Sequence, residues 1–190
     1  MELILVRHGE STWSRQEADA DPPLTELGRE QARRLGQWLD AHYQFTAFYS
    51  SPLRRARETA EIVNKELGLD IVFDDDLREA EVNYAAAMPR RDGPLAEEAD
   101  RAPLGAEYEQ FRSRVRRALE RIIAANPDGT VLVIAHGGTV ATMVRCLLGV
   151  HSVSISTRNT GLHGLRWQDG RWEIRFMNRC EHLLPDLARD

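Results

Sequence analysis

The sequence predicts one α/β domain over residues 1–190, a three-layer α/β/α sandwich with a mainly parallel central sheet and an antiparallel edge hairpin. Short apolar runs rich in β-branched residues alternate along the chain with stretches in which apolar residues recur at helical spacing. Near the end, Asp169-Gly170 separates two further strand-like runs, which is a typical hairpin signal. The composition agrees, since 42% hydrophobic and 29% charged residues are ordinary for one folded domain of 190 residues.

Three short runs in the first half of the chain predict strands, because their length and β-branching favour extended backbone. They are residues 3–6, 45–49 and 71–73. Between the first two runs, apolar residues recur at helical spacing over residues 27–39, and Thr25 is the expected N-cap of this helix. Between the second and third runs, Ser51-Pro52 predicts a helix that begins with a serine cap and runs to about Gly68.

The second half of the chain opens with residues 79–107, which show no sustained period. We expect an insertion at about 80–107, either a lid or a mobile surface loop. Apolar residues then recur over residues 111–122 and predict a helix with an arginine-rich, solvated face. Residues 131–135 are the clearest buried strand and lead into a further helix. The two strands of the predicted hairpin are residues 162–167 and 172–177. The arginines on the solvated face of the helix over residues 111–122 are Arg112, Arg114, Arg116, Arg117 and Arg121.

Charge, hydropathy and cysteine spacing exclude several classes of protein. The formal net charge of -5 argues against nucleic-acid binding, because such domains usually carry a basic excess. The longest apolar runs, such as residues 131–135, are far too short to cross a bilayer, and Arg7 comes too early for a signal peptide. We therefore expect a cytoplasmic protein without a membrane partner. Cys146 and Cys180 lack the spacing of a zinc site and are expected to be reduced.

Two histidines stand at matching places in the predicted fold. Arg7 and His8 follow the first strand, and His136 and Gly137 follow residues 131–135. If these strands are neighbours in a parallel sheet, their carboxyl ends bring both imidazoles to one edge, where such sheets bind ligands. A lone histidine after a strand is usually a polar loop residue, but two in matching His-Gly contexts indicate a functional site.

Two kinds of chemistry could use this pair of histidines. A metal hydrolase needs ligands at metal-binding spacing, but neither His-x-His nor His-Glu-x-x-His occurs, and Arg7 places a cation where the metal would sit. Guanidinium groups, imidazoles and backbone N–H groups instead complement the oxygens of a phosphate dianion. A neutral imidazole can attack phosphorus to form a phosphoramidate that water cleaves, while a carboxylic acid protonates the leaving alkoxide. We therefore expect neither a metal nor a cofactor.

Four segments in order carry a specific resemblance to a known family. They are residues 5–11 (LVRHGES), 51–60 (SPLRRARETA), 77–79 (LRE) and 134–139 (IAHGGT). These segments resemble the motifs of the histidine phosphatase superfamily, also called the phosphoglycerate mutase-like family. The resemblance spans most of the chain and implies that family's fold and catalysis through a phosphohistidine. Residues 80–85 depart from the family pattern, in which many relatives have glycine followed by Trp-Glu-Gly.

The resemblance implies roles for the residues around the two histidines. It implies that His8 is the nucleophile and that Arg7, Arg55 and His136 bind the phosphoryl oxygens. His136 would do so best when protonated. Helical periodicity does not distinguish Arg55 from the arginines that flank it; the family motif, with arginine directly before Ala56, does.

The same resemblance implies a general acid and further contacts with the phosphate. Glu79 matches the family's proton donor, which later acts as the base for water, and four nearby carboxylates compete for this assignment. Ser14 stands where relatives usually have asparagine, and with the backbone N–H of Gly137 it is expected to contact phosphate. Asn159 precedes the hairpin at a position that often carries asparagine in relatives. The competing carboxylates are Asp74, Asp75, Asp76 and Glu81.

We predict a metal-independent phosphomonoesterase that acts on a small-molecule phosphate ester. The alternative in the same pocket is phosphoryl transfer of the cofactor-dependent phosphoglycerate mutase type. The mutases that the chain resembles carry a longer, basic insertion after the acid, whereas this stretch is short and acidic around residues 97–100. A phosphate-recognising module without turnover is a third hypothesis, against which the presence of both His8 and Glu79 argues. The physiological ester and the oligomeric state stay open.

Overall fold

The structure is a computed structural model that describes residues 1–12, 21–81, 83–91 and 103–183. Over these residues the strands are β1 (Glu2–Arg7), β2 (Ala47–Ser50), β3 (Ile71–Phe73), β4 (Thr130–Ala135), β5 (Leu162–Gln168) and β6 (Arg171–Arg179). The α-helices are α1 (Glu26–His42), α2 (Arg54–Leu67), α3 (Ala106–Ala125) and α4 (Gly137–Leu148). Two short 3-10 turns, η1 (Asp75–Leu77) and η2 (Tyr84–Ala87), lie between β3 and α3.

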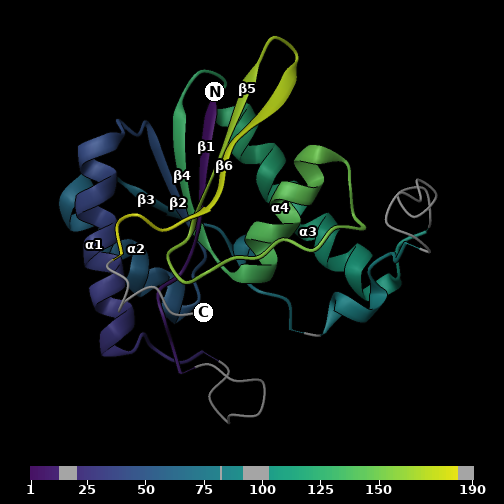
Figure 1. Cartoon of the computed structure of the whole chain (residues 1–190), viewed down its shortest axis with the longest axis horizontal. Helices are drawn as coiled ribbons and strands as arrows, with labels where there is room; N and C mark the ends of the chain where they lie inside the picture. Colours follow the sequence, from purple (N-terminus) through teal and green to yellow (C-terminus); the bar gives the residue numbers. More distant parts are fainter. Residues whose placement is uncertain (13–20, 82, 92–102, 184–190) are drawn as a thin grey trace.

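The strands form one sheet in the order β3-β2-β4-β1-β5-β6 (Figure 1). β3, β2, β4 and β1 are parallel to one another, whereas β5 runs antiparallel to both β1 and β6. The β5–β6 hairpin turns at Asp169, with a φ of 52°, and Gly170, with a φ of 74°, left-handed conformations that suit a tight hairpin. The predicted parallel sheet with an antiparallel edge hairpin is confirmed.

Helices cover both faces of this sheet, α1 and α2 on one face and α3 and α4 on the other (Figure 1). Alternate side chains of β1 point to opposite faces: Leu3 and Leu5 pack in the core under α3 and α4, and Ile4 and Val6 pack in the core under α1 and α2. All four are fully buried, and each contributes about 1.5–3 kcal/mol of hydrophobic stabilisation. The predicted three-layer sandwich is confirmed.

The start of α2 differs from the prediction. The sequence favoured a cap by Ser51, but α2 begins at Arg54, and its N-cap residue Leu53 makes no side-chain cap. Ser51 is fully buried, and its Oγ lies 2.8 Å from Nε2 of His136. The hydroxyl also accepts the N–H of Leu53 at 3.3 Å, so it contacts the turn before α2 as well as a residue far away in the sequence. The preceding strand, β2, also begins two residues later than the predicted residues 45–49.

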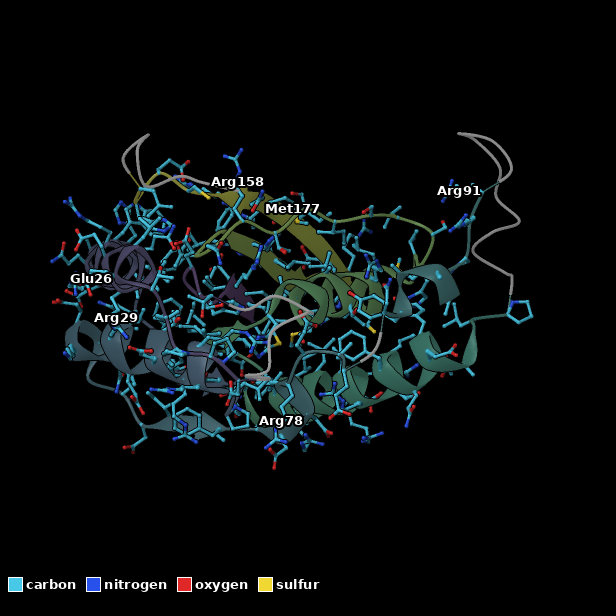
Figure 2. All side chains as sticks on the ribbon, turned by 90° about the horizontal axis from the view of Figure 1, so that it is seen from below. Glu26, Arg29, Arg78, Arg91, Arg158 and Met177 are labelled. Atoms are coloured by element: carbon cyan, nitrogen blue, oxygen red, sulfur yellow. The ribbon has the colours of Figure 1, made fainter. Side chains whose placement is uncertain are left out.

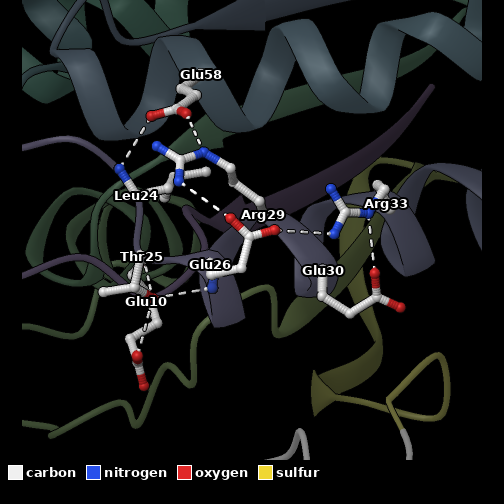
Figure 3. Close-up of polar contacts among 9 residues, drawn as sticks. Glu10, Leu24, Thr25, Glu26, Arg29, Glu30, Arg33 and Glu58 are labelled. Carbon is white, nitrogen blue, oxygen red and sulfur yellow. Dashed lines mark hydrogen bonds and ion pairs between the residues drawn. The ribbon is translucent and has the colours of Figure 1, made fainter.

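Polar contacts tie α1 to α2 and to the loop that follows β1 (Figure 3). Thr25 caps α1 as predicted, and its Oγ1 also donates to Oε1 of Glu10 at 2.9 Å. Nε of Arg29 lies 2.7 Å from Oε1 of Glu58, while Oε2 of Glu58 accepts the backbone N–H of Leu24 at 3.0 Å. Glu10 is therefore tied to the start of α1, and the backbone of Leu24 is tied to α2.

The arginine-rich face of α3 is solvated only in part, contrary to the prediction. Arg117 and Arg121 are exposed and pair with Asp76, at 3.3 Å and 2.9 Å. Arg114 is half-buried and donates to backbone carbonyls within residues 75–79. Helical periodicity identifies the outer face of a helix but cannot show that another segment folds against it.

The predicted insertion at about 80–107 is described in part, because residues 82 and 92–102 lie outside the described residues. The ring of Tyr84 in η2 packs 4.8 Å from the ring of Phe111 and 5.5 Å from that of Tyr108. Because α3 already begins at Ala106, the helix includes the last two residues of the predicted insertion. The acidic residues 97–100, on which the preference for a phosphatase partly rests, are not among the described ones.

Membrane and thiol properties follow from burial and helix composition. No helix in the described ranges is both long and apolar enough to cross a membrane. Cys146 is a free thiol, as predicted, and Cys146 and Cys180 are both half-buried. Burial raises the pKa of the Cys146 thiol to about 11, so this side chain is protonated and unreactive near neutral pH.

Two buried histidines near β5 and β6 predict acid sensitivity of the fold. Burial lowers the pKa of His163 and of His182 to about 4 in each case. The unfolded chain binds these protons near pH 6.5, so it holds more protons than the folded protein at acid pH. We expect the free energy of unfolding to fall as pH drops from about 6.5 through 4, by about 2 kcal/mol per histidine between pH 7 and pH 5. Urea unfolding at both pH values measures this loss.

The matched variant is His182→Gln, which removes one titrating group from this region. Its unfolding free energy should depend less steeply on pH than that of the wild type. Equal slopes for the two proteins would show that His182 does not contribute to acid sensitivity.

Candidate active site

The two motif histidines lie side by side at the carboxyl ends of β1 and β4. These strands are parallel neighbours with Arg7 opposite Ala135, so the next residue of each chain segment is a histidine. The ring centroids of His8 and His136 are 5.1 Å apart in an edge-on arrangement, and both side chains are buried. Figure 2 shows the molecule from below, toward the edge of the sheet where these strands end. The predicted convergence of the histidines is therefore seen in the fold.

The hydrogen bonds of His8 select one tautomer of its imidazole. Nδ1 lies 2.7 Å from the carbonyl oxygen of Gly9, which can only accept, so Nδ1 carries the proton. Nε2 lies 3.2 Å from Nε of Arg55, which donates to it, so Nε2 holds a lone pair. Burial, followed by the charges of Arg55 and Arg7, lowers the pKa of His8 well below its usual value. The ring is therefore neutral and nucleophilic at Nε2.

Two arginines carry positive charge near the His8 ring, and of these Arg55 is buried and Arg7 is half-buried. Arg7 donates from NH1 to the carbonyl of Thr157 at 2.7 Å, and NH1 of Arg55 lies 3.7 Å from Oδ1 of Asp21. Burial is the main cause that lowers the pKa of Arg7 and of Arg55. Desolvated guanidinium groups at the carboxyl edge of a sheet favour an anionic ligand, because its charge replaces the lost hydration.

Arg55, rather than its neighbours, faces the histidines, as the motif implied. Its side chain is only 2% exposed. Arg54 is exposed, and Arg57 stacks over the ring of Phe73 at 4.0 Å. The hydroxyl of Thr59 donates to the carbonyl of Arg55 at 2.7 Å, which helps to hold the first turn of α2.

His136 is held by Ser51 and carries one nitrogen that no described residue satisfies. Its Nε2 lies 2.8 Å from Oγ of Ser51, and its buried Nδ1 has no hydrogen-bond partner in the described part of the chain. Burial lowers the pKa of His136 well below its usual value, and His8, Arg55 and Arg7 lower it further. The protonated form is therefore disfavoured by these surroundings, and an opposite charge, such as a bound dianion, would raise this pKa.

Glu79, in the segment that follows β3 and η1, lines the same cavity as His8 and Arg55. Its Oε2 accepts the backbone N–H of Gly138, in the first turn of α4, at 2.9 Å, and its Oε1 accepts the N–H of Ala80 at 3.0 Å. A Cβ at position 138 would stand 2.5 Å from Oε1 of Glu79, so only glycine lets the carboxyl lie against the helix. The neighbouring side chain of Arg78 projects outward (Figure 2), and Glu79 lines the cavity.

The competing carboxylates are placed elsewhere. Asp74 and Asp76 pair with Arg121, at 2.7 Å and 2.9 Å. Asp75 pairs with Arg78 at 2.9 Å and is exposed. None of these aspartates lines the cavity at His8, and neither does Glu81. The geometry therefore favours Glu79 over the alternatives.

A cavity of about 230 Å³ lies at His8, Arg55 and Glu79. His136 is packed beside His8 but is not among the residues that line this cavity. Its lining residues come from all four motifs and from the segment before β5. They are Arg7, His8, Ser11, Arg55, Glu79, Gly137 and Asn159. A pocket this small, with two arginines and the first residue of a helix in its wall, suits a phosphoryl group and not a large ligand.

Some expected contacts lie outside the described residues, and others were missed. Ser14 is not among the described residues, so its predicted contact with phosphate stays a prediction. Asn159 donates from Nδ2 to the carbonyl of His8 at 3.0 Å, which orients the backbone of the first motif. Ser51 and Thr59 were not assigned to the site, although both stand in the motif that supplied Arg55.

The donor set does not resemble a metal centre. In the four described ranges, no group of three or more histidine, cysteine, aspartate or glutamate side chains is arranged to hold a metal ion. The positive charges of Arg7 and Arg55 act on the His8 ring and would repel a metal cation bound there.

The fold and the site together define a class of protein, namely α/β proteins that gather histidines and arginines around a small anion cavity at the sheet edge. The chain belongs to the histidine phosphatase superfamily (branch 1), whose family profile matches residues 3–179.

Individual relatives include both phosphatases and mutase-like proteins. An uncharacterized phosphatase, PhoE of Bacillus subtilis (strain 168), is 32% identical over 186 residues, with 95% of this chain and 96% of that protein covered. The probable phosphoglycerate mutase GpmB of Salmonella choleraesuis (strain SC-B67) is 28% identical, with 90% and 87% covered. A mycobacterial glucosyl-3-phosphoglycerate phosphatase, solved with inorganic phosphate, superimposes with a TM-score of 0.71 at 26% identity, covering 96% and 99%.

Proposed function

We propose that the protein is a metal-independent phosphomonoesterase that works through a phosphohistidine on His8. The observation that carries this proposal is the state of the His8 ring, whose unprotonated Nε2 lies in the cavity beside Arg55. Membership of a superfamily with phosphatases among its similar proteins supports the same conclusion.

The first half of the reaction transfers the phosphoryl group to the enzyme. Nε2 of His8 attacks phosphorus as the bond between phosphorus and the ester oxygen breaks. The carboxylic acid of Glu79 gives its proton to the departing oxygen, so the alcohol leaves neutral. Gly138 and Ala80 hold the carboxyl of Glu79 in place for this transfer.

The second half regenerates the free histidine. The Glu79 carboxylate takes a proton from a water molecule, whose oxygen attacks phosphorus while the bond between phosphorus and Nε2 breaks. Inorganic phosphate leaves, the electron pair returns to Nε2, and Glu79 is again an acid. Nδ1 of His8 keeps its proton throughout and donates it in a hydrogen bond to the carbonyl of Gly9.

Positive charge and N–H donors stabilise the phosphoryl oxygens in both halves. We assign this role to Arg7, Arg55, the backbone N–H of Gly137 and Nδ1 of His136, which has a buried and unsatisfied position beside the nucleophile. The dianion raises the pKa of His136 and so favours the protonated, donating form in the complex. Such preorganised donors are usually the largest contribution to phosphoryl-transfer rates.

The substrate class follows from the size and charge of the cavity. A small phosphate ester whose alcohol portion extends out past Glu79 fits the arrangement. A mutase-type transfer remains the second candidate function, since a relative of 28% identity is a probable phosphoglycerate mutase. The two differ in whether water or a second hydroxyl receives the phosphoryl group.

Hydrolysis of p-nitrophenyl phosphate in excess EDTA tests the proposal directly. We expect activity that is unchanged by the chelator and is retained at mildly acidic pH, because the lowered pKa of His8 keeps its ring neutral there. Loss of activity in EDTA with recovery on adding a divalent cation would contradict the metal-independent mechanism. Transfer to an added phosphate acceptor without release of inorganic phosphate would instead support the mutase.

A further inference from the structure

Arg114 of α3 hydrogen-bonds to the backbone segment that carries the proposed acid, Glu79. Its NH1 donates to the carbonyl of Arg78 at 2.9 Å and, at 3.2 Å and 3.4 Å, to those of Asp76 and Asp75. Its NH2 donates to the carbonyl of Glu79 at 3.1 Å. One guanidinium group therefore binds four carbonyl oxygens of the segment that ends at the acid.

This arrangement differs from that of the neighbouring arginines on α3. Arg117 and Arg121 are exposed and bind side-chain carboxylates. In the described ranges Arg114 has no ion pair within 4.0 Å, and its hydrogen-bond partners are backbone carbonyls. The guanidinium carbon of Arg114 also lies 5.1 Å from the centre of the Phe111 ring, so its position is fixed on a second side. Binding of this kind orders a backbone segment, which a surface ion pair does not.

A second contact holds the same segment from α4. Oγ1 of Thr139 donates to the carbonyl of Arg78 at 3.0 Å, and the N–H of Gly138 donates to Oε2 of Glu79 at 2.9 Å. The Glu79 carboxyl is thus fixed at its tip by α4 and at its backbone by α3. Because α4 begins directly after His136, the two helices together fix the acid relative to the histidines.

We propose that Arg114 is a positioning residue for the general acid, holding Glu79 at the distance from the leaving oxygen that proton transfer requires. The inference rests on the proposed function of Glu79 and adds a residue that acts only through it. A shift of about 1 Å in a catalytic group can lower the rate about 100-fold, so loss of the hydrogen bonds from Arg114 should have a measurable effect on turnover.

The test is a double-mutant cycle with two esters. Arg114→Lys keeps the charge but cannot form the forked set of hydrogen bonds. We expect it to lower kcat/KM for glycerol 2-phosphate, a poor leaving group, by about 10-fold or more, and for p-nitrophenyl phosphate by less than about threefold. In a Glu79→Gln background the same change should cost less than about twofold on either ester, because the acid is already lost.

Other outcomes overturn the proposal. Equal losses on both esters, or a loss that persists in the Glu79→Gln background, would show that Arg114 contacts substrate or serves stability alone. Arg117→Lys is the matched control on the same helix and should leave both esters unaffected. If Arg114→Lys is poorly folded by thermal unfolding, Arg114→Gln provides the second variant with the same expected pattern.

Hydrogen exchange gives a readout that does not depend on turnover. Amides in residues 78–81 should exchange faster in Arg114→Lys than in the wild type and stay unchanged in Arg117→Lys. If the exchange rates of these amides are unchanged in Arg114→Lys, the hydrogen bonds of Arg114 do not order this segment, and the inference is overturned. If the wild type hydrolyses neither ester, the proposed function fails, and the exchange measurement still decides whether Arg114 orders the segment.

Discussion

Replacing His8 with alanine is expected to abolish phosphate-ester hydrolysis, lowering kcat/KM on the order of 10⁴-fold or more while the fold is retained. In the proposed mechanism this imidazole supplies the attacking nitrogen, and His8 is the one histidine among the described residues that line the cavity. Initial rates with p-nitrophenyl phosphate measure the loss, and circular dichroism checks the fold. Mass spectrometry of quenched wild-type enzyme should find the phosphoryl group on His8.

The matched control for this variant is His42→Ala. His42 is an exposed histidine at the end of α1, stacked on Trp38 with ring centroids 4.2 Å apart. Its removal should leave turnover unchanged. Near-normal activity in His8→Ala would disprove the covalent mechanism, since no phosphohistidine could then form at this position.

Replacing Glu79 with glutamine is expected to slow the hydrolysis of alkyl phosphates by about 10²- to 10⁴-fold, the usual contribution of general acid catalysis. For p-nitrophenyl phosphate the loss should be less than about 10-fold, because a good leaving group departs without a proton. The ratio of kcat/KM values for glycerol 2-phosphate and p-nitrophenyl phosphate reports this difference. Glutamine keeps the shape of the side chain, so the cavity should be preserved.

Glu81→Gln is the matched control for the acid. Glu81 is exposed and does not line the cavity, so its loss should change neither ester. Equal losses on both esters in Glu79→Gln would instead assign the proton transfer to another group, and a leaving-group effect in Glu81→Gln would point to that residue.

Local sequence predicted the sheet and the convergence of the histidines because both depend on short-range signals. Buried strands show as continuous apolar runs, and a residue directly after such a strand must lie at its carboxyl end. His8 and His136 could therefore be placed without knowing any contact between them. Arg55 needed the family resemblance, because its burial depends on the cavity it faces and not on helical periodicity.

The errors share one physical cause, namely contacts between segments far apart in the sequence. Ser51 has the sequence context of a helix cap, but its hydroxyl binds His136. Arg114 has the spacing of a solvated residue, but η1 and the acid segment fold against it. No local pattern records either partner.

The pairing of β1 with its two neighbours has a consequence for how the protein is made. Leu3 lies opposite Val131 in β4 and opposite Leu165 in β5, so the first strand of the chain pairs only with strands synthesised much later. Such non-local pairing slows folding, because the entropy of closing the intervening chain is lost before the contacts form. During synthesis on the ribosome, β1, which leads into His8, therefore stays unpaired until β4 has been made. His8, the proposed nucleophile, is thus synthesised long before His136 and Asn159, which the folded chain places beside it.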